Sequence, residues 1–307
     1  MAILNENDIK KRLIENAALF NNIYVINQTF DVLPNSKEHY GASINFQDIQ
    51  ELRSEFLTEL YCSIINWVYS SEKYTELKRL YMEAGRSEEA ACVAIHEKAR
   101  NKFRGNKDSN NLLIQGQLGE LLLFHFIQKC MHAVPLLRKM KITTSRDHER
   151  FGADAIHFKY DDGKPIIILG EAKTYTSDYK FNTAFNDAIN SILTTYSEHK
   201  DELHLYLHED FLDMEMNEIA EKYLNNTLEN VEVHLVSIVV YNETQTLNVT
   251  NESDIKKQIK KIIEERYANF DKNKIDLETN AILNRITYIV FPVWKLDELA
   301  QQFQDKL

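Results

Sequence analysis

The 307-residue chain has few cysteines, no long apolar run and no surplus of positive charge. Its three cysteines stand far apart with no paired spacing, which excludes a disulfide framework and a four-cysteine zinc site and indicates a reducing compartment. No apolar stretch approaches the roughly 18 residues that a membrane span requires, and the first residues lack the apolar core of a signal peptide. The sequence therefore predicts a cytoplasmic protein.

The net charge of the chain limits how it can bind nucleic acid. A net charge of −11 argues against a general electrostatic attraction to phosphate. Any role on nucleic acid must then depend on local basic patches, metal ions or a partner protein. The chain also lacks the Gly-rich loop followed by Lys-Ser/Thr that cradles nucleotide phosphates, so it is not expected to hydrolyse ATP.

Apolar periodicity predicts two regions. Residues 1–110 show apolar positions at three- and four-residue spacing and are predicted to be a mainly helical N-terminal region that serves docking or control. Residues 111–307 alternate strands and helices, which is typical of an α/β fold with a mixed sheet flanked by helices. The predicted helices of this second region are 112–131, 182–197, 254–270 and 295–306, and the predicted strands are 139–143, 153–160, 166–175, 203–207, 231–241 and 286–293.

Charged residues occupy unexpected positions in the hairpin FGADAIHFKYDDGKPIIILGEAKTYTS, residues 151–177. If Asp162-Gly163 forms the turn, residues that face each other have numbers that sum to 325, so Asp154 faces Glu171. Period-two alternation places Lys173 on the same face as Glu171. The neighbouring apolar residues alternate between both faces, which predicts a sheet covered on both sides.

Two facing carboxylates in such a sheet need a compensating positive charge. A hard divalent cation, Mg²⁺ or Mn²⁺, takes oxygen ligands from carboxylates, water and substrate phosphate. Lys173 could then orient a water molecule or neutralise charge on a phosphate. The alternative is a structural salt bridge from Lys173 to Asp154 or Glu171. The third charge on the same face favours a functional site.

A further acidic residue lies in the stretch GQLGELLLFHF, residues 116–126. Glu120 is surrounded by leucines on a helix that is predicted to be mostly buried. Gly116 and Gly119 each cost a helix about 1 kcal/mol relative to Ala, and they are explained if the helix lies close to the sheet or to a ligand. Glu120 could instead be a solvated residue on a polar stripe, but together with the hairpin it is the predicted third acidic group.

A helix with a Glu, a strand with an Asp and a strand ending in Glu-x-Lys together resemble the PD-(D/E)xK nuclease superfamily. Its αβββαβ core would fit residues 112–241, and Glu-Ala-Lys at 171–173 matches its signature, although Gly-Ala-Asp replaces Pro-Asp. The superfamily resemblance therefore covers less than half of the chain. Three sequence stretches are similar to the HamA family, the nuclease subunits of Hachiman antiphage systems. They are QLGELLLFHF, FGADAIHF and GEAKTY.

The resemblance implies roles for particular residues. Glu120, Asp154 and Glu171 would hold the metal with the Ala172 carbonyl, and Lys173 would serve the attacking water. The narrower resemblance implies a cytoplasmic bacterial protein that degrades DNA during phage infection and is restrained by a helicase subunit.

A basic segment precedes the Glu120 helix. It carries five positive charges and no acidic residue between positions 98 and 107, which is consistent either with a solvated helix end or with a phosphate-contacting patch. The residues of this candidate nucleic-acid interface are Lys98, Arg100, Lys102, Arg104 and Lys107.

The sequence therefore predicts an Mg²⁺-dependent endonuclease that hydrolyses DNA with little sequence preference. The alternative is a catalytically inactive module with a nuclease-like fold that binds nucleic acid or a partner. Retention of Glu120, Asp154, Glu171 and Lys173 favours the enzyme, because a binding module gains nothing from clustered like charges.

Overall fold

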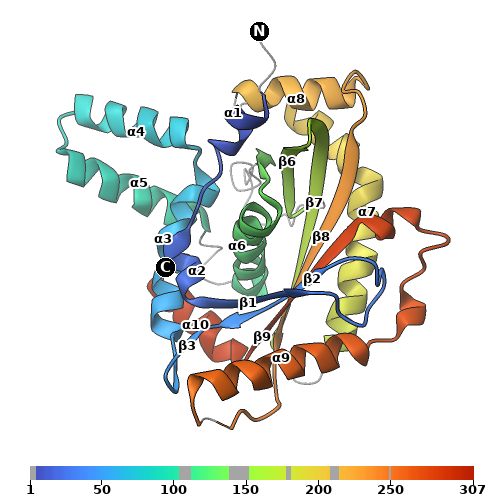
Figure 1. Cartoon of the computed structure of the whole chain (residues 1–307). Coiled ribbons are helices and arrows are strands. Elements are labelled where there is room, and N and C mark those ends of the chain that lie inside the picture. The colour runs from blue at the N-terminus through green and yellow to red at the C-terminus, as the bar shows by residue number, and fades with distance from the viewer. Residues whose placement is uncertain (1–4, 104–111, 138–151, 178–180, 208–213, 249) are drawn as a thin grey trace.

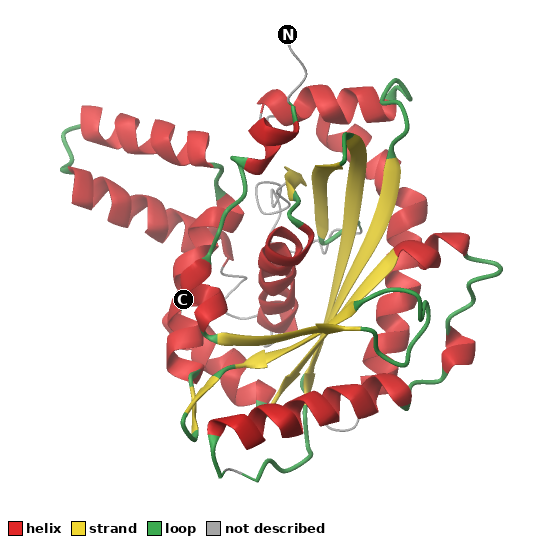
Figure 2. Cartoon of the chain, in the orientation of Figure 1, coloured by secondary structure: helices red, strands yellow, loops and turns green. Residues whose placement is uncertain are grey.

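The computed structural model describes residues 5–103, 112–137, 152–177, 181–207, 214–248 and 250–307. Within these ranges the chain is an α/β protein, with a mixed seven-stranded sheet flanked by helices (Figures 1 and 2). The strands of this sheet are β1 Ile23–Gln28, β2 His39–Ile44, β5 Val134–Leu137, β6 Ala155–Asp161, β7 Lys164–Tyr175, β8 Glu232–Asn242 and β9 Ile286–Val293, and β3 Phe46–Gln47 and β4 Gln50–Glu51 form a separate pair. The α-helices are α1 Glu6–Lys10, α2 Ala17–Asn21, α3 Arg53–Val68, α4 Ser71–Glu83, α5 Glu88–Phe103, α6 Leu112–Met131, α7 Phe181–Leu207, α8 Met214–Leu224, α9 Glu252–Ala268 and α10 Leu296–Lys306.

The strands lie in the order β1-β2-β9-β8-β7-β6-β5. Strands β2, β9, β8 and β7 pair in parallel, whereas β1, β6 and β5 are added antiparallel at the two sides. Parallel strands that are covered on both faces are expected to be apolar along their whole length. Strand β9, with the sequence ITYIVFPV, is buried at every position and fits this expectation.

Helices cover both faces of the sheet (Figure 2). On β7, Ile167 and Leu169 pack into the cluster that includes α7, α8 and α9, which we call the α7 face. The alternate residues Ile166 and Ile168 pack into the cluster that includes α3, α6 and α10, which we call the α6 face. The prediction of a sheet covered on both sides is thus confirmed, and the alternation of side chains along β7 explains it.

The N-terminal region, predicted to be mainly helical, also contains strands that the sequence did not predict. Helices α3, α4 and α5 agree with the predicted helical character, but residues 23–44 contain β1 and β2, and β2 pairs with β9. Strand β2 contains Gly41, where an added Cβ would lie 2.8 Å from the Ile263 side chain of α9. The N-terminal region therefore contributes strands to the same sheet that carries β7.

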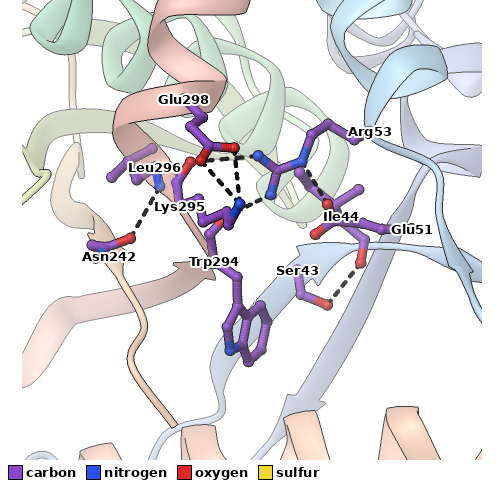
Figure 3. A network of polar contacts seen from close by, with 9 residues as sticks. All are labelled: Ser43, Ile44, Glu51, Arg53, Asn242, Trp294, Lys295, Leu296 and Glu298. Atoms are coloured by element: carbon purple, nitrogen blue, oxygen red, sulfur yellow. Dashed lines mark hydrogen bonds and ion pairs between the residues drawn. The ribbon is translucent and has the colours of Figure 1, made fainter. Parts of the chain in front are cut away.

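The start of α3 is also tied to the C-terminal part of the chain (Figure 3). Arg53 forms an ion pair with Glu51 at 2.6 Å and donates to the carbonyl oxygen of Trp294 at 2.5 Å. Asn242, at the end of β8, accepts the Leu296 backbone N–H at 3.0 Å and so holds the first residue of α10. These contacts join segments that lie far apart in the sequence.

Most predicted elements after residue 110 are present, with two exceptions. Residues 203–207 form the last turns of α7, so the predicted short strand is wrong. Their sequence LHLYL fits a two-residue period as well as a helical one, and short apolar runs are ambiguous for this reason. The predicted strand 139–143 lies outside the described residues, and β5 instead pairs with β6 from Val134 onward.

None of the described helices combines the length and the apolar character needed to cross a membrane.

Candidate active site

The β6–β7 hairpin has the predicted turn and register. Asp162 and Gly163 both have positive φ, 49° and 77°, as a two-residue turn of this kind requires. Ala155 pairs with Gly170 and Asp161 with Lys164, so facing residue numbers sum to 325. The paired register begins at Ala155, and Asp154 lies just before it, with its backbone N–H donating to the Gly170 carbonyl at 3.1 Å. Its Oδ2 accepts the Ala172 N–H at 2.9 Å.

The candidate site lies where β7 extends past the beginning of β6. Residues Glu171–Tyr175 still pair with Ser237–Tyr241 of β8, but no described strand pairs with them on the other side. The N–H and C=O of one strand residue point to the same neighbouring side. Because the Ala172 N–H reaches Asp154, its carbonyl oxygen is directed to the same open edge. A carboxylate and a backbone carbonyl thus converge there.

Glu171 is held by three side-chain donors on the α7 face. It is only 4% exposed. Its Oε1 accepts from Lys173 Nζ at 3.0 Å and from Ser191 Oγ at 2.6 Å. Its Oε2 accepts from Thr195 Oγ1 at 3.0 Å. The side chain of Lys173 is 29% exposed, so its ammonium lies between the buried carboxylate and solvent.

The electrostatics differ from those of a simple ion pair. Burial raises the pKa of Glu171 above its usual value, and the negative charge of Asp154 raises it further. Lys173 and the Ser191 hydroxyl act in the opposite direction but do not restore the ordinary pKa. A raised carboxyl pKa is frequent at functional sites and also occurs in structural ion-pair networks. The raised pKa of Glu171 shows that Lys173 alone does not neutralise the acidic pair.

Glu120 lies on the helix that covers the opposite face of β7. An added Cβ at the preceding residue, Gly119, would lie 2.4 Å from Thr174 Oγ1, so α6 packs directly on this end of β7 as predicted. Glu120 itself is half-buried. The same explanation does not apply to Gly116, where an added Cβ would meet no atom within 4 Å.

The structure therefore brings together Asp154, Glu171 and Lys173. Among the described residues, no group of three or more His, Cys, Asp or Glu side chains is close enough to hold a metal ion. The oxygen donors at this end of β7 are the Asp154 carboxylate and the Ala172 carbonyl at the open edge and the Glu171 carboxylate on the α7 face. Such donors suit a hard cation such as Mg²⁺ that completes its coordination with water and phosphate. The predicted third ligand, Glu120, stays a prediction.

The basic segment is described only in part. Lys98, Arg100 and Lys102 lie on α5, and their cationic groups stand over the rings of Tyr81, Tyr61 and Tyr69 at 4.8, 5.1 and 5.3 Å from the centroids. These contacts pack α5 against its neighbours, and Lys98 and Lys102 are still exposed. Arg104 and Lys107 lie outside the described residues. A role of this segment in nucleic-acid binding stays a prediction.

Sequence reasoning missed the donors on α7. Ser191 and Thr195 lie one turn apart on a helix that follows the Glu-Ala-Lys strand, and residues with this spacing share one face. This one-turn spacing of two hydroxyl residues was the signal available in the sequence. Asn190, a more conspicuous polar residue in the same helix, is exposed.

Comparison with known proteins adds one finding. A family model described as HamA matches residues 18–307. The matched span includes β1, β2 and every residue of the candidate site. No curated protein matches the chain.

Proposed function

The chain belongs to the HamA family and so to a multi-subunit Hachiman defence system, and we propose that it is a metal-dependent DNA endonuclease of that system. The observation that carries the proposal is the grouping of Asp154, Glu171 and Lys173 at the end of β7, where Asp154 contacts Ala172, Lys173 contacts Glu171, and the charge of Asp154 acts on Glu171. Burial and the charge of Asp154 raise the pKa of Glu171 despite the neighbouring ammonium, which supports a site where a further cation would compensate the acidic pair.

Asp154, Glu171 and the Ala172 carbonyl would hold Mg²⁺ or Mn²⁺, with Glu120 as the predicted additional ligand. Such a cation, when bound, polarises a phosphoryl oxygen and lowers the pKa of a bound water. The Ala172 N–H fixes the Asp154 carboxylate at the edge through Oδ2, which orients this side chain toward the place where the cation would lie. The geometry thus supplies acceptors at one edge from β7 and from the residue that precedes β6.

Lys173 would act on the water and the phosphate. Its ammonium donates to Glu171 Oε1 and is partly exposed, so it can hold a water molecule beside the carboxylates. The positive charge also stabilises the negative charge that builds up on the phosphoryl oxygens in the transition state. An adjacent phosphate would therefore meet an ammonium on one side and the acidic pair on the other.

The first experiment measures cleavage of circular DNA, linear DNA and RNA by the purified chain in Mg²⁺, Mn²⁺, Ca²⁺ or chelator. We expect DNA cleavage in Mg²⁺ and Mn²⁺, and suppression by Ca²⁺, which prefers a larger coordination shell. Asp154→Asn and Glu171→Gln should abolish cleavage. Asp161→Asn, at the exposed turn of the same hairpin, is the matched control and should not.

Two outcomes would contradict the proposal. Full cleavage in chelator would exclude a metal-dependent mechanism. Binding of DNA without cleavage in any metal, with or without a partner, would favour the alternative of an inactive nuclease-like module.

We also propose that a DNA-engaging partner, a helicase, controls the enzyme. A chain with a net charge of −11 is expected to bind free DNA weakly at physiological salt. A nuclease without sequence preference must also be prevented from cutting the DNA of its own cell. Helices α4 and α5 project from the body (Figure 1), and α4 has no buried residue. Leu80 and Met82 on α4 and Val93 on α5 are exposed apolar residues, at 44%, 44% and 62%.

Replacement of Leu80, Met82 and Val93 by Ser should abolish co-purification with the helicase and leave the melting temperature of the chain nearly unchanged. Leu205→Ser, at an apolar residue that is 71% exposed on α7, is the control. Retention of the complex in the triple variant would place the partner elsewhere.

A further inference from the structure

Helix α7 presents a line of polar side chains toward the segments that carry the acidic pair. Ser191, Thr195 and Glu202 are separated by four and then seven residues, so they lie along one face of a helix with 3.6 residues per turn. Thr195 and Glu202 are buried, at 5% and 7% exposure, and buried His199 lies between them and contacts the Tyr223 hydroxyl at 2.6 Å. Buried polar groups in such a place require partners.

The first two members of this line hold Glu171. A carboxylate has about four acceptor positions on its two oxygens. Ser191 and Lys173 donate to Oε1, and Thr195 donates to Oε2. These three donors orient the carboxylate and leave about one acceptor position, on Oε2, for a further ligand.

The third member holds the residue that precedes Asp154. Glu202 Oε2 accepts the Ala153 backbone N–H at 2.7 Å, a contact across 49 residues of sequence. At Gly152, φ is +140°, and an added Cβ would lie 2.3 Å from Glu202 Oε1. Glycine is favoured there by the positive φ, and the Glu202 carboxylate occupies the space that a Cβ would take. The backbone immediately before Asp154 is therefore held against α7.

We propose that Ser191, Thr195 and Glu202 are positioning residues that hold Glu171 and Asp154 in the arrangement that binds the divalent cation. The inference rests on the proposed function and deepens it. None of the three would touch the substrate. Partners that orient metal ligands usually contribute about 10- to 100-fold to metal affinity, because the carboxylates would otherwise have to be ordered when the cation binds.

The test uses the full chain and measures Mn²⁺ binding by calorimetry, together with DNA cleavage as a function of Mn²⁺ concentration. Thr195→Val keeps the shape of the side chain and removes its donor, and Ser191→Ala removes the other hydroxyl. The matched controls are Thr194→Val and Ser197→Ala, because both residues are exposed on the same helix and donate to backbone carbonyls of that helix.

We expect Thr195→Val and Ser191→Ala to weaken Mn²⁺ binding by about 10-fold each. The Mn²⁺ concentration for half-maximal cleavage should rise by the same factor, while the rate at saturating Mn²⁺ changes little. Thr195→Ser restores the donor and should restore affinity. Equal Mn²⁺ affinity in Thr195→Val and Thr194→Val would overturn the inference.

Glu202→Gln and Glu202→Ala test the bond between Glu202 and the Ala153 backbone N–H. Gln retains an oxygen for the Ala153 N–H, so we expect Mn²⁺ affinity near that of the unchanged chain, and Ala should lower it by about 10-fold or more. If Glu202→Ala lowers the melting temperature but leaves Mn²⁺ affinity unchanged, Glu202 is only structural and the inference fails for it.

Failure of the inference is distinguishable from failure of the proposed function. If Asp154→Asn binds Mn²⁺ and cleaves DNA like the unchanged chain, the proposed site itself is wrong. If Asp154→Asn loses both properties while the α7 variants keep them, only the positioning role is refuted.

Discussion

Two glutamates on adjacent strands of the sheet each pair with a lysine, yet their surroundings give them opposite properties. Glu232, near the beginning of β8, is bonded by Lys164 and by His234 at 2.9 Å, with Arg285 at 3.5 Å. These partners lower its pKa to about 2. Glu171, near the end of β7, is bonded by Lys173, but burial and Asp154 raise its pKa.

The difference shows that an acid–lysine pair by itself does not indicate a site. At Glu232 three positive or potentially positive groups surround one carboxylate, and the arrangement is satisfied without any ligand. At Glu171 burial and a second carboxylate outweigh the neighbouring ammonium. The negative charge of Glu171 is therefore only partly compensated, and a cation would relieve this. The ion-pair cluster of Glu232 with Lys164, beside the turn of the β6–β7 hairpin, is stable without a ligand, whereas the end of β7 with Glu171 is suited to binding a cation.

The largest expected effect comes from removing Lys173, and the matched comparison removes Lys164, the lysine that pairs with Glu232. Lys173→Ala should lower the rate of DNA cleavage by about 10²- to 10⁴-fold, because it removes the group that acts on water and phosphate. Lys164→Ala removes the corresponding lysine partner of Glu232 and should leave cleavage nearly unchanged. Steady-state cleavage rates of the two variants in Mg²⁺ are compared. Equal losses would show that the Glu171 and Glu232 clusters do not differ in function.

The close approach of α6 to the site end of β7 can be tested with its two glycines. Gly119→Ala should destabilise the chain by about 1–3 kcal/mol, because the added Cβ meets Thr174 Oγ1 at 2.4 Å. Gly116→Ala meets no neighbour and should stabilise the helix by up to about 1 kcal/mol. Urea unfolding gives both free energies. A Gly119→Ala variant as stable as Gly116→Ala would contradict the packing described here.

The two glutamates should respond with opposite signs to loss of charge in the metal-free chain. Glu171→Gln removes a buried like-charge repulsion, so its melting temperature in chelator near neutral pH should stay the same or rise. Glu232→Gln loses favourable pairs and should be less stable by about 1 kcal/mol or less, because its partners are partly exposed. Thermal unfolding monitors both. A large loss of stability in Glu171→Gln would favour the structural salt bridge.

These stability differences should disappear in acid. Glu232 has a lowered pKa, so its contribution is present above the ordinary value of 4.5 and is lost as the pH falls toward about 2. Glu171 has a raised pKa, so its unfavourable contribution is absent below 4.5 and grows as the pH rises through the raised pKa. The difference between Glu171→Gln and Glu232→Gln in free energy of unfolding should therefore shrink below pH 4.5. A pH-independent difference would contradict both assignments.

The hairpin could be predicted from sequence because local rules determine it. Asp162-Gly163 specifies the turn, the turn specifies the register, and alternation places Glu171 and Lys173 on one face. Strand β9 and helix α6 could be predicted for a similar reason, because each is a long apolar segment with one consistent period.

The remaining features depend on contacts between distant segments. Strand β2 is short and joins the sheet through β9, which lies near the other end of the chain, so no local pattern separates it from the helical segments around it. The bond between Glu202 and Ala153 likewise depends on how α7 crosses the hairpin. The position of Glu120 relative to the acidic pair is set by the packing of α6 on the opposite face of β7, which the spacing of residues does not encode.

The central claim is that the open edge of β7 binds a divalent cation. The most direct test is a crystal structure of the chain with Mn²⁺, in which anomalous scattering locates the ion. We predict a peak bonded to carboxylate oxygens of Asp154 and Glu171 and to the Ala172 carbonyl oxygen, with a coordinated water near Lys173. A Mn²⁺ peak at another place, with this edge empty at saturating concentration, would contradict the account.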